Sequence, residues 1–106
     1  MINNEEKTYS LIGLATRAGK VVSGDDSTLL ELKRGNVELV IVAQDASDNT
    51  KKLFKDKCAY RNIPQISFST KLQLGLCIGK APRAAMGIKD KNFAKRIQEL
   101  IETTKI

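Results

Sequence analysis

Residues 37–45, VELVIVAQD, are the segment that decides the fold. The run from Leu39 to Ala43 is apolar and β-branched without an alternating polar side. Such a run is typical of a strand buried on both faces of a parallel or mixed sheet. Both faces of that sheet then need a covering layer, because each layer must bury its apolar surface against another. The pattern therefore predicts helices above and below the sheet.

Helical and extended patterns alternate on both sides of this strand. The helices are expected at residues 3–20, 27–35, 51–62, 71–79 and 91–106, and the strands at 20–24, 37–45, 63–69 and 84–90. This alternation predicts an α/β fold, a three-layer α/β/α sandwich with a small mixed sheet of about four strands. The chain has 106 residues and no repeat or linker, so a single domain over 1–106 is expected.

Short polar side chains mark the expected helix starts. They accept a hydrogen bond from the first free amides of a helix. The candidate caps are Asn3 or Asn4, Asp25 or Asp26, Asp48 or Asn49, and Ser69 or Thr70. Apolar stripes are expected at Leu11, Leu14, Ala15 and Ala18 in the first helix, and at Phe93, Ile97, Leu100 and Ile101 in the last.

The composition narrows the classes of function. Eighteen Lys plus Arg against 12 Asp plus Glu give a net charge of +6, which favours a polyanionic partner, nucleic acid first and an anionic membrane second. The apolar runs are far shorter than the ~20 residues that span a bilayer, and no signal peptide opens the chain. A cytoplasmic protein without a membrane partner is expected.

Residue chemistry gives little support for catalysis. The chain has no His, so a Ser-His-Asp or Cys-His arrangement cannot be assembled. The stretch GLATRAGK resembles a phosphate-binding loop. However, the spacing between its glycines is one residue too long, and Val21 stands where the loop needs a metal-binding hydroxyl. Cys58 and Cys77 are isolated and predict neither a disulfide nor a metal site. The prediction is a non-enzyme without cofactor, metal or small-molecule substrate.

The cations gather near the ends of the expected elements. Four of them close helices, where they also complement the helix dipole, and that structural role alone would explain them. Two open the third helix, the unfavourable end for a cation, and two flank Pro82. The set is Arg17, Lys20, Lys33, Arg34, Lys51, Lys52, Lys80 and Arg83.

Several motifs together resemble a known family. LIGLATRAGKVVSG, LKRG, LVIVAQDASDNTKK and LGLCIGKAPRAAMGIKD follow, in order and spacing, the YlxQ-type bacterial ribosome-associated proteins. These belong to the kink-turn RNA-binding superfamily of the archaeal L-seven-Ae ribosomal proteins. The resemblance covers nearly the whole chain and implies an α/β/α sandwich. It also implies structured RNA as partner, ribosomal RNA foremost, with ribosomal or translation proteins as further partners.

The family reads its RNA with the pattern Gly-x-Asn-Glu-x-x-Lys at a strand-to-helix junction and with the loop before the last strand. The aligned residues here are Gly24, Asp26, Ser27 and Leu30, of which only Gly24 matches, and Lys80 to Arg83 occupy the second loop. The resemblance thus implies RNA contacts by Gly24, Asp25, Asp26 and Ser27 together with the eight cations. A protein-interaction module of the same fold, whose RNA face has lost specificity, is the alternative.

The two acids at this junction have a physical role of their own in RNA recognition. An unpaired guanine edge, as in sheared G·A pairs, presents N1–H and N2–H donors, and an Asp side chain can accept from them. The competing interpretation is that Asp25 and Asp26 only cap the helix. Both roles can coexist if one Asp caps and the other faces outward.

Overall fold

The structure is a computed structural model and describes residues 3–104. Its elements are α1 (Asn4–Arg17), β1 (Val21–Ser23), α2 (Asp25–Lys33), β2 (Leu39–Val42), α3 (Asp48–Arg61), β3 (Gln65–Ser67), α4 (Lys71–Cys77), β4 (Ala85–Ile88) and α5 (Lys91–Thr104). The predicted alternation of helices and strands is confirmed over the described residues. Residues 105 and 106 of the last predicted helix lie outside them.

The sheet is mixed and has the order β1-β4-β2-β3. β4 pairs antiparallel with both β1 and β2, whereas β2 and β3 are parallel. All four residues of β2 and of β4 are buried, as the unbroken apolar run at 39–43 predicts for central strands. The C-terminal ends of β1, β2 and β3 therefore lie at the same end of the sheet as the start of β4.

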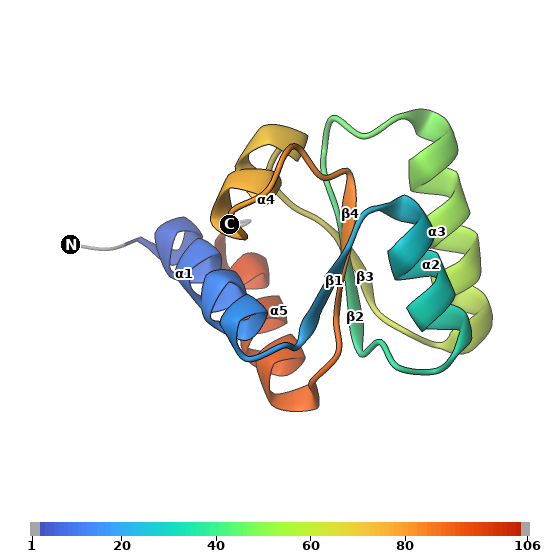
Figure 1. The fold of residues 1–106 in the computed structure, drawn as a ribbon, viewed down its shortest axis with the longest axis horizontal. Coiled ribbons are helices and arrows are strands. Elements are labelled where there is room, and N and C mark those ends of the chain that lie inside the picture. Colours follow the sequence, from blue (N-terminus) through green and yellow to red (C-terminus); the bar gives the residue numbers. More distant parts are fainter. Residues whose placement is uncertain (1–2, 105–106) are drawn as a thin grey trace.

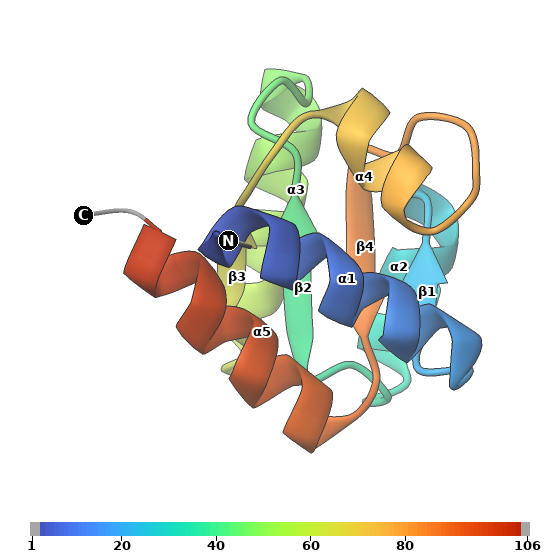
Figure 2. The same ribbon diagram turned by 90° about the vertical axis from the view of Figure 1, so that its left-hand side faces the viewer.

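Helices cover both faces of the sheet. In Figure 1 α1, α4 and α5 lie on one side of the strands, and α2 and α3 lie on the other. Turned by a quarter, Figure 2 shows α1 and α5 lying next to each other across the first face. Buried side chains from both layers and the sheet form one hydrophobic cluster, in which Phe54, Ile41 and Ile97 are fully buried. The three-layer sandwich predicted from the sequence is confirmed.

Two of the expected caps are confirmed and two are wrong. Asn3 caps α1 and Thr70 caps α4, each by accepting a hydrogen bond from a backbone amide of the first turn. Ser47, rather than Asp48 or Asn49, caps α3 by accepting from the Thr50 amide. The N-cap of α2 is Gly24, which has no side chain to offer, so neither Asp25 nor Asp26 caps that helix. Tertiary pairing of β1 with β4 sets where α2 begins.

The apolar stripe predicted for α1 is confirmed for Ala15, which is buried, and for Leu11, which is half-buried against the core, but it is wrong for the other two residues. Thr8, Ile12 and Ala15 are the buried residues of the helix, whereas Leu14 is 52% exposed and Ala18 is exposed. The helix packs against α5, α4 and β1 at once, and these contacts decide its rotation. The stripe predicted for α5 is confirmed, since Ile97, Leu100 and Ile101 are buried and Phe93 is half-buried.

Both cysteines are free and their thiols are hard to ionise. Burial raises the pKa of the Cys58 thiol from 9.0 to about 11, and it raises that of Cys77 to about 11 as well. The thiolate is the reactive form, so we expect both cysteines to react with iodoacetamide at pH 8 roughly 100-fold more slowly in the folded protein than in urea. Mass spectrometry of timed samples measures the two rates.

The same pKa shift makes the folded state less favoured at high pH. The folded thiols hold their protons up to a higher pH than the unfolded thiols do, so their contribution to stability is complete below pH 9 and is lost as the pH rises toward 11. Equal alkylation rates in the folded and unfolded protein would contradict the burial of both thiols.

Candidate functional site

Three segments that are distant in the sequence meet at one end of the sheet. They are the β1–α2 junction, the β2–α3 loop with the first turn of α3, and the α4–β4 loop. The strand directions require this, because Ser23 at the end of β1 pairs with Met86, and Val42 at the end of β2 pairs with Ala85. Two backbone bonds tie the segments together. The Gly24 amide donates to the Ala85 carbonyl at 3.0 Å, and the Ala43 amide donates to the Ala84 carbonyl at 2.8 Å.

The β1–α2 junction leaves the first turn of α2 open. Gly24 adopts φ 91° and ψ 152°, a conformation that is essentially restricted to glycine. No side chain caps the helix, so the amides of Asp26 and Ser27 receive no side-chain cap. The positive end of the helix dipole is also here and favours the two carboxylates beside it. The junction thus offers backbone donors and acidic acceptors side by side.

The two aspartates have different surroundings. The Asp25 carboxylate accepts from the Thr50 hydroxyl at 3.2 Å, and Thr50 in turn accepts from the Ser47 hydroxyl at 3.0 Å. This relay joins α2 to the start of α3. The side chain of Asp26 is exposed and forms no hydrogen bond with any residue between 3 and 104. One acid therefore positions the junction and the other is available to a ligand.

The α4–β4 loop is held against the same end of the sheet by Arg83. Its Nε donates to the Ser23 hydroxyl at 3.2 Å, and one terminal nitrogen donates to the carbonyls of Ala81 and Pro82. Its backbone amide donates to the Lys71 carbonyl at 3.0 Å, while the Lys71 amide donates to Asp45 at 2.8 Å. A guanidinium has five N–H groups, so Arg83 retains donors beyond these bonds.

Eight of the twelve residues predicted from the sequence come together on this surface, which we call the tip surface. Asp26, Ser27, Lys52 and Lys80 are exposed there, and the other four are half-buried. The tip surface consists of Gly24, Asp25, Asp26, Ser27, Lys51, Lys52, Lys80 and Arg83. The N-termini of α2 and α3 both point their free amides toward it.

The other four predicted residues, Arg17, Lys20, Lys33 and Arg34, follow the ends of α1 and α2 and lie at the opposite end of the sheet. Lys20 lines a hollow of about 420 Å³ there, together with Gly19, Gly35, Asn36, Glu38 and Lys89. Glu31 accepts from Asn36 at 2.9 Å and from Arg34 at 3.2 Å, and these bonds, with the nearby Lys89, lower the pKa of its carboxyl. Arg34 thus already has a carboxylate partner.

Sequence reasoning missed the residues that hold the tip surface in shape. They are Ser23, Asp45, Thr50 and Gly75. A Cβ on Gly75 would come within 2.3 Å of the Ala81 carbonyl oxygen, so the α4–β4 loop rests directly on the backbone of α4. A glycine in the middle of the helical stretch KLQLGLC was the available signal, since glycine there costs helix stability without a packing reason.

The arrangement has the chemistry of a surface suited to a polyanion. Over residues 3–104, no group of three or more His, Cys, Asp or Glu side chains is placed to hold a metal ion. Cations from the first turn of α3 and from the α4–β4 loop surround the exposed acceptors and open amides of the β1–α2 junction, which suits a ligand carrying both phosphates and hydrogen-bond donors. No helix within the same residues is long and apolar enough to cross a membrane.

The fold and the order of motifs agree with one protein family. Residues 6–98 match the model of the ribosomal protein L7Ae/L30e/S12e/Gadd45 family. The chain belongs to this family.

Two bacterial relatives are similar over most of the chain. It is 43% identical to the RNA-binding protein YlxQ of Enterococcus faecium over 99 residues, covering 93% of this chain and 95% of the relative. It is 38% identical to the RNA-binding protein YlxQ of Bacillus subtilis strain 168, covering 89% and 94%. A solved structure of a protein with unknown function from Bacillus halodurans C superimposes with a TM-score of 0.88 at 38% identity, covering 91% of this chain and 97% of that chain.

Proposed function

We propose that this protein is a non-enzymatic, cytoplasmic RNA-binding protein that recognises a kinked or internal-loop segment of structured RNA through the tip surface. The observation that carries the proposal is the meeting of three hydrogen-bonded segments that present cations, exposed acceptors and open helix amides together. Both YlxQ relatives are named as RNA-binding proteins, and this supports the class of ligand. The ribosomal family supports ribosomal RNA and a role in translation.

The proposed contacts divide into positioning and recognition. Lys51, Lys52, Lys80 and Arg83 attract and position phosphates, which supplies most of the affinity and its salt dependence. Asp26 and Ser27 face non-Watson–Crick pairs, where the Asp26 carboxylate accepts from guanine N1–H and N2–H. The four cations at the opposite end of the sheet do not touch an RNA segment that is bound to the tip surface. They contribute only long-range electrostatic attraction; they are Arg17, Lys20, Lys33 and Arg34.

A titration of two RNAs tests this proposal. One RNA contains a kink-turn with tandem sheared G·A pairs, and the other has Watson–Crick pairs in their place. We expect tight binding to the kink-turn and weak, steeply salt-dependent binding to the duplex. Equal binding to both RNAs at every salt concentration would contradict recognition by Asp26 and Ser27.

Replacement of a single exposed lysine at either end of the sheet shows which end contributes to RNA binding. Lys80 lies on the tip surface and Lys33 lies at the opposite end, and both are exposed. We expect Lys80→Ala to weaken RNA binding and to flatten the slope of log K against log [salt] by roughly one unit, the effect of one lost phosphate contact. Lys33→Ala is the matched control and should leave the slope within error. Equal effects of the two substitutions would reject the tip surface as the main contact.

A protein-interaction module is the alternative function. Capture of partners with and without nuclease distinguishes it from the proposed function, because RNA-mediated partners are lost after digestion. Proteins that remain bound after digestion, together with no binding to either RNA, would favour the alternative.

A further inference from the structure

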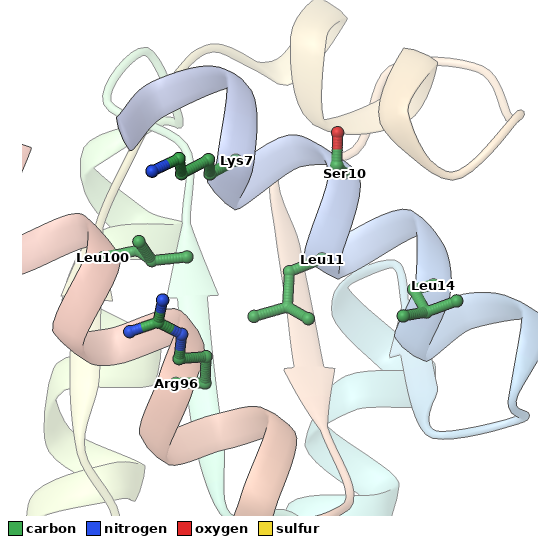
Figure 3. A pocket seen from close by; sticks show the side chains of 6 residues that line it. All are labelled: Lys7, Ser10, Leu11, Leu14, Arg96 and Leu100. Carbon is green, nitrogen blue, oxygen red and sulfur yellow. The ribbon is translucent and has the colours of Figure 1, made fainter. Parts of the chain in front are cut away.

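An apolar groove runs between α1 and α5, on the sheet face opposite α2 and α3. Its volume is about 290 Å³, and it is lined by Lys7, Ser10, Leu11, Leu14, Arg96 and Leu100. None of these residues belongs to the tip surface. Figure 3 shows Leu11 and Leu100 facing each other from the two helices, with Lys7 and Arg96 on either side of Leu100.

Each wall of the groove combines leucine with one cation. On α1, Lys7, Leu11 and Leu14 are spaced i, i+4 and i+7, and on α5, Arg96 and Leu100 are spaced i and i+4. The two helices are antiparallel, as shown by the bond from Asn4 near the start of α1 to Thr103 near the end of α5. Each wall therefore contributes leucine to the floor and one cation to the rim.

The core of the protein covers these leucines only in part, since Leu11 packs against it from one side and Leu14 is left largely exposed. The fully buried residues of α1 are Thr8, Ile12 and Ala15, and Leu11 and Leu14 extend this apolar side of the helix from the edge of the core to the surface. Leu14 is 52% exposed and Leu11 is half-buried, which leaves apolar area in contact with water. A partner that covers these leucines would remove this apolar area from water, which favours binding.

The cations on the rim are available to a partner. Lys7 forms no ion pair with any residue from 3 to 104, and it lies near the N-terminal end of α1, where the helix dipole does not favour a positive charge. Arg96 pairs with Glu99 at 3.7 Å, but both side chains are more than half exposed, so this pair contributes little and can be exchanged. The lining includes two cations and no acid.

We propose that the groove docks an amphipathic, acidic segment of another protein. Its apolar side chains would enter between Leu11, Leu14 and Leu100, and its Asp or Glu residues would pair with Lys7 and Arg96. Helices with this pattern bind apolar grooves through anchors at i, i+3, i+4 and i+7. A second copy of this chain suits the groove less well, because a two-fold contact sets a patch against itself and would oppose cation to cation.

Two synthetic peptides of about 18 residues test the proposal, since this length supports a helix that spans the groove. Both carry leucines along one face; one has Glu and the other has Lys at the flanking positions. Fluorescence anisotropy measures affinity, and amide NMR shifts locate the binding site. We expect saturable binding of the acidic peptide, with shifts confined to α1 and α5. Equal binding of both peptides, or shifts outside these helices, would overturn the proposal.

Variants of the protein make the test specific. Leu14→Glu should weaken binding of the acidic peptide at least roughly tenfold, as expected for a buried apolar anchor. Leu30→Glu is the matched control, because Leu30 is 49% exposed on α2, away from the groove, and its replacement should leave binding unchanged. Exchange of both rim cations in Lys7→Glu/Arg96→Glu changes exposed residues only and should reverse the preference toward the basic peptide. An unchanged preference would overturn the proposal.

Sedimentation and RNA titration test whether the groove is instead occupied by a second copy of this chain or by RNA. We expect the protein to remain monomeric across the concentrations used for peptide binding. A dimer that Leu14→Glu abolishes would assign the groove to a second copy and overturn the proposal. RNA-induced NMR shifts centred on Leu11 and Leu14 would overturn it in favour of RNA. Binding of the acidic peptide by a protein saturated with RNA would support a partner that docks independently of the tip surface.

Discussion

The substitution Gly75→Ala is expected to lower the free energy of unfolding by about 2 kcal/mol and to weaken RNA binding by roughly tenfold. The new Cβ would lie 2.3 Å from the Ala81 carbonyl oxygen and 2.9 Å from that of Lys80. These are backbone atoms of the α4–β4 loop, so the side chains cannot relieve the contact by changing rotamer. The loop must move away from α4, and it carries Lys80 and Arg83 with it.

The substitution by itself would stabilise helix α4. The sign of the change in the free energy of unfolding is therefore informative. Ala is preferred over Gly in a helix by about 1 kcal/mol, so only the contact with the loop can make Gly75→Ala destabilising. Gly13→Ala provides the control. It is also a glycine within a helix, but its Cβ would lie 3.1 Å from the Cys77 carbonyl oxygen, a distance that a small shift relieves.

Urea unfolding and RNA titration measure both effects. We expect Gly13→Ala to be near neutral in stability and RNA binding, and Gly75→Ala to be impaired in both. A destabilised Gly75→Ala protein that still binds RNA normally would separate the α4–β4 loop from the RNA contact. A Gly75→Ala protein as stable as the wild type would contradict the close packing of the loop on α4.

The second large effect is expected from Gly24→Ala. Gly24 has φ 91° and ψ 152°, and an added Cβ meets no atom within 4 Å, so the cost comes from backbone conformation alone. Holding a non-glycine residue in such a conformation costs about 1–3 kcal/mol. A change of φ relieves that cost only by reorienting Asp25 and Asp26 and by breaking the bond from the Gly24 amide to Ala85. Preference for the kink-turn RNA over the duplex should therefore fall.

Gly35→Ala is the matched control at the other end of α2. Gly35 has φ 78° and open space around its Cβ position, so its replacement should cost about 1–2 kcal/mol for the left-handed conformation. It lies at the opposite end from the tip surface, and RNA preference should be retained. Thermal unfolding and the paired RNA titration distinguish the two variants. Loss of RNA preference in both would indicate a general effect of destabilisation.

Periodic segments could be predicted from the sequence because their pattern records which side is buried. The run at 39–43 indicated a strand covered on both faces, and the stripe of α5 indicated its core side. Helix starts were less predictable, since several short polar residues stand in a row at each one. The β1–β4 pairing makes Gly24 the N-cap of α2, and the α5, α4 and β1 contacts rotate α1 so that Leu14 faces outward.

Some features of the candidate site could likewise be predicted from the sequence, and others depend on the tertiary structure. The sequence by itself determined the α/β alternation, the positive charge, the glycine at the β1–α2 junction and the twelve candidate residues from which the tip surface is drawn, because these depend on composition and local order. Only the tertiary structure decided which cations share one end of the sheet. The antiparallel pairing of β4 with β1 and β2 brings Lys80 and Arg83 to Gly24 and leaves Lys20 and Arg34 at the other end. Proximity between segments arises from strand direction and register, which are properties of the assembled sheet rather than of any single stretch of the chain.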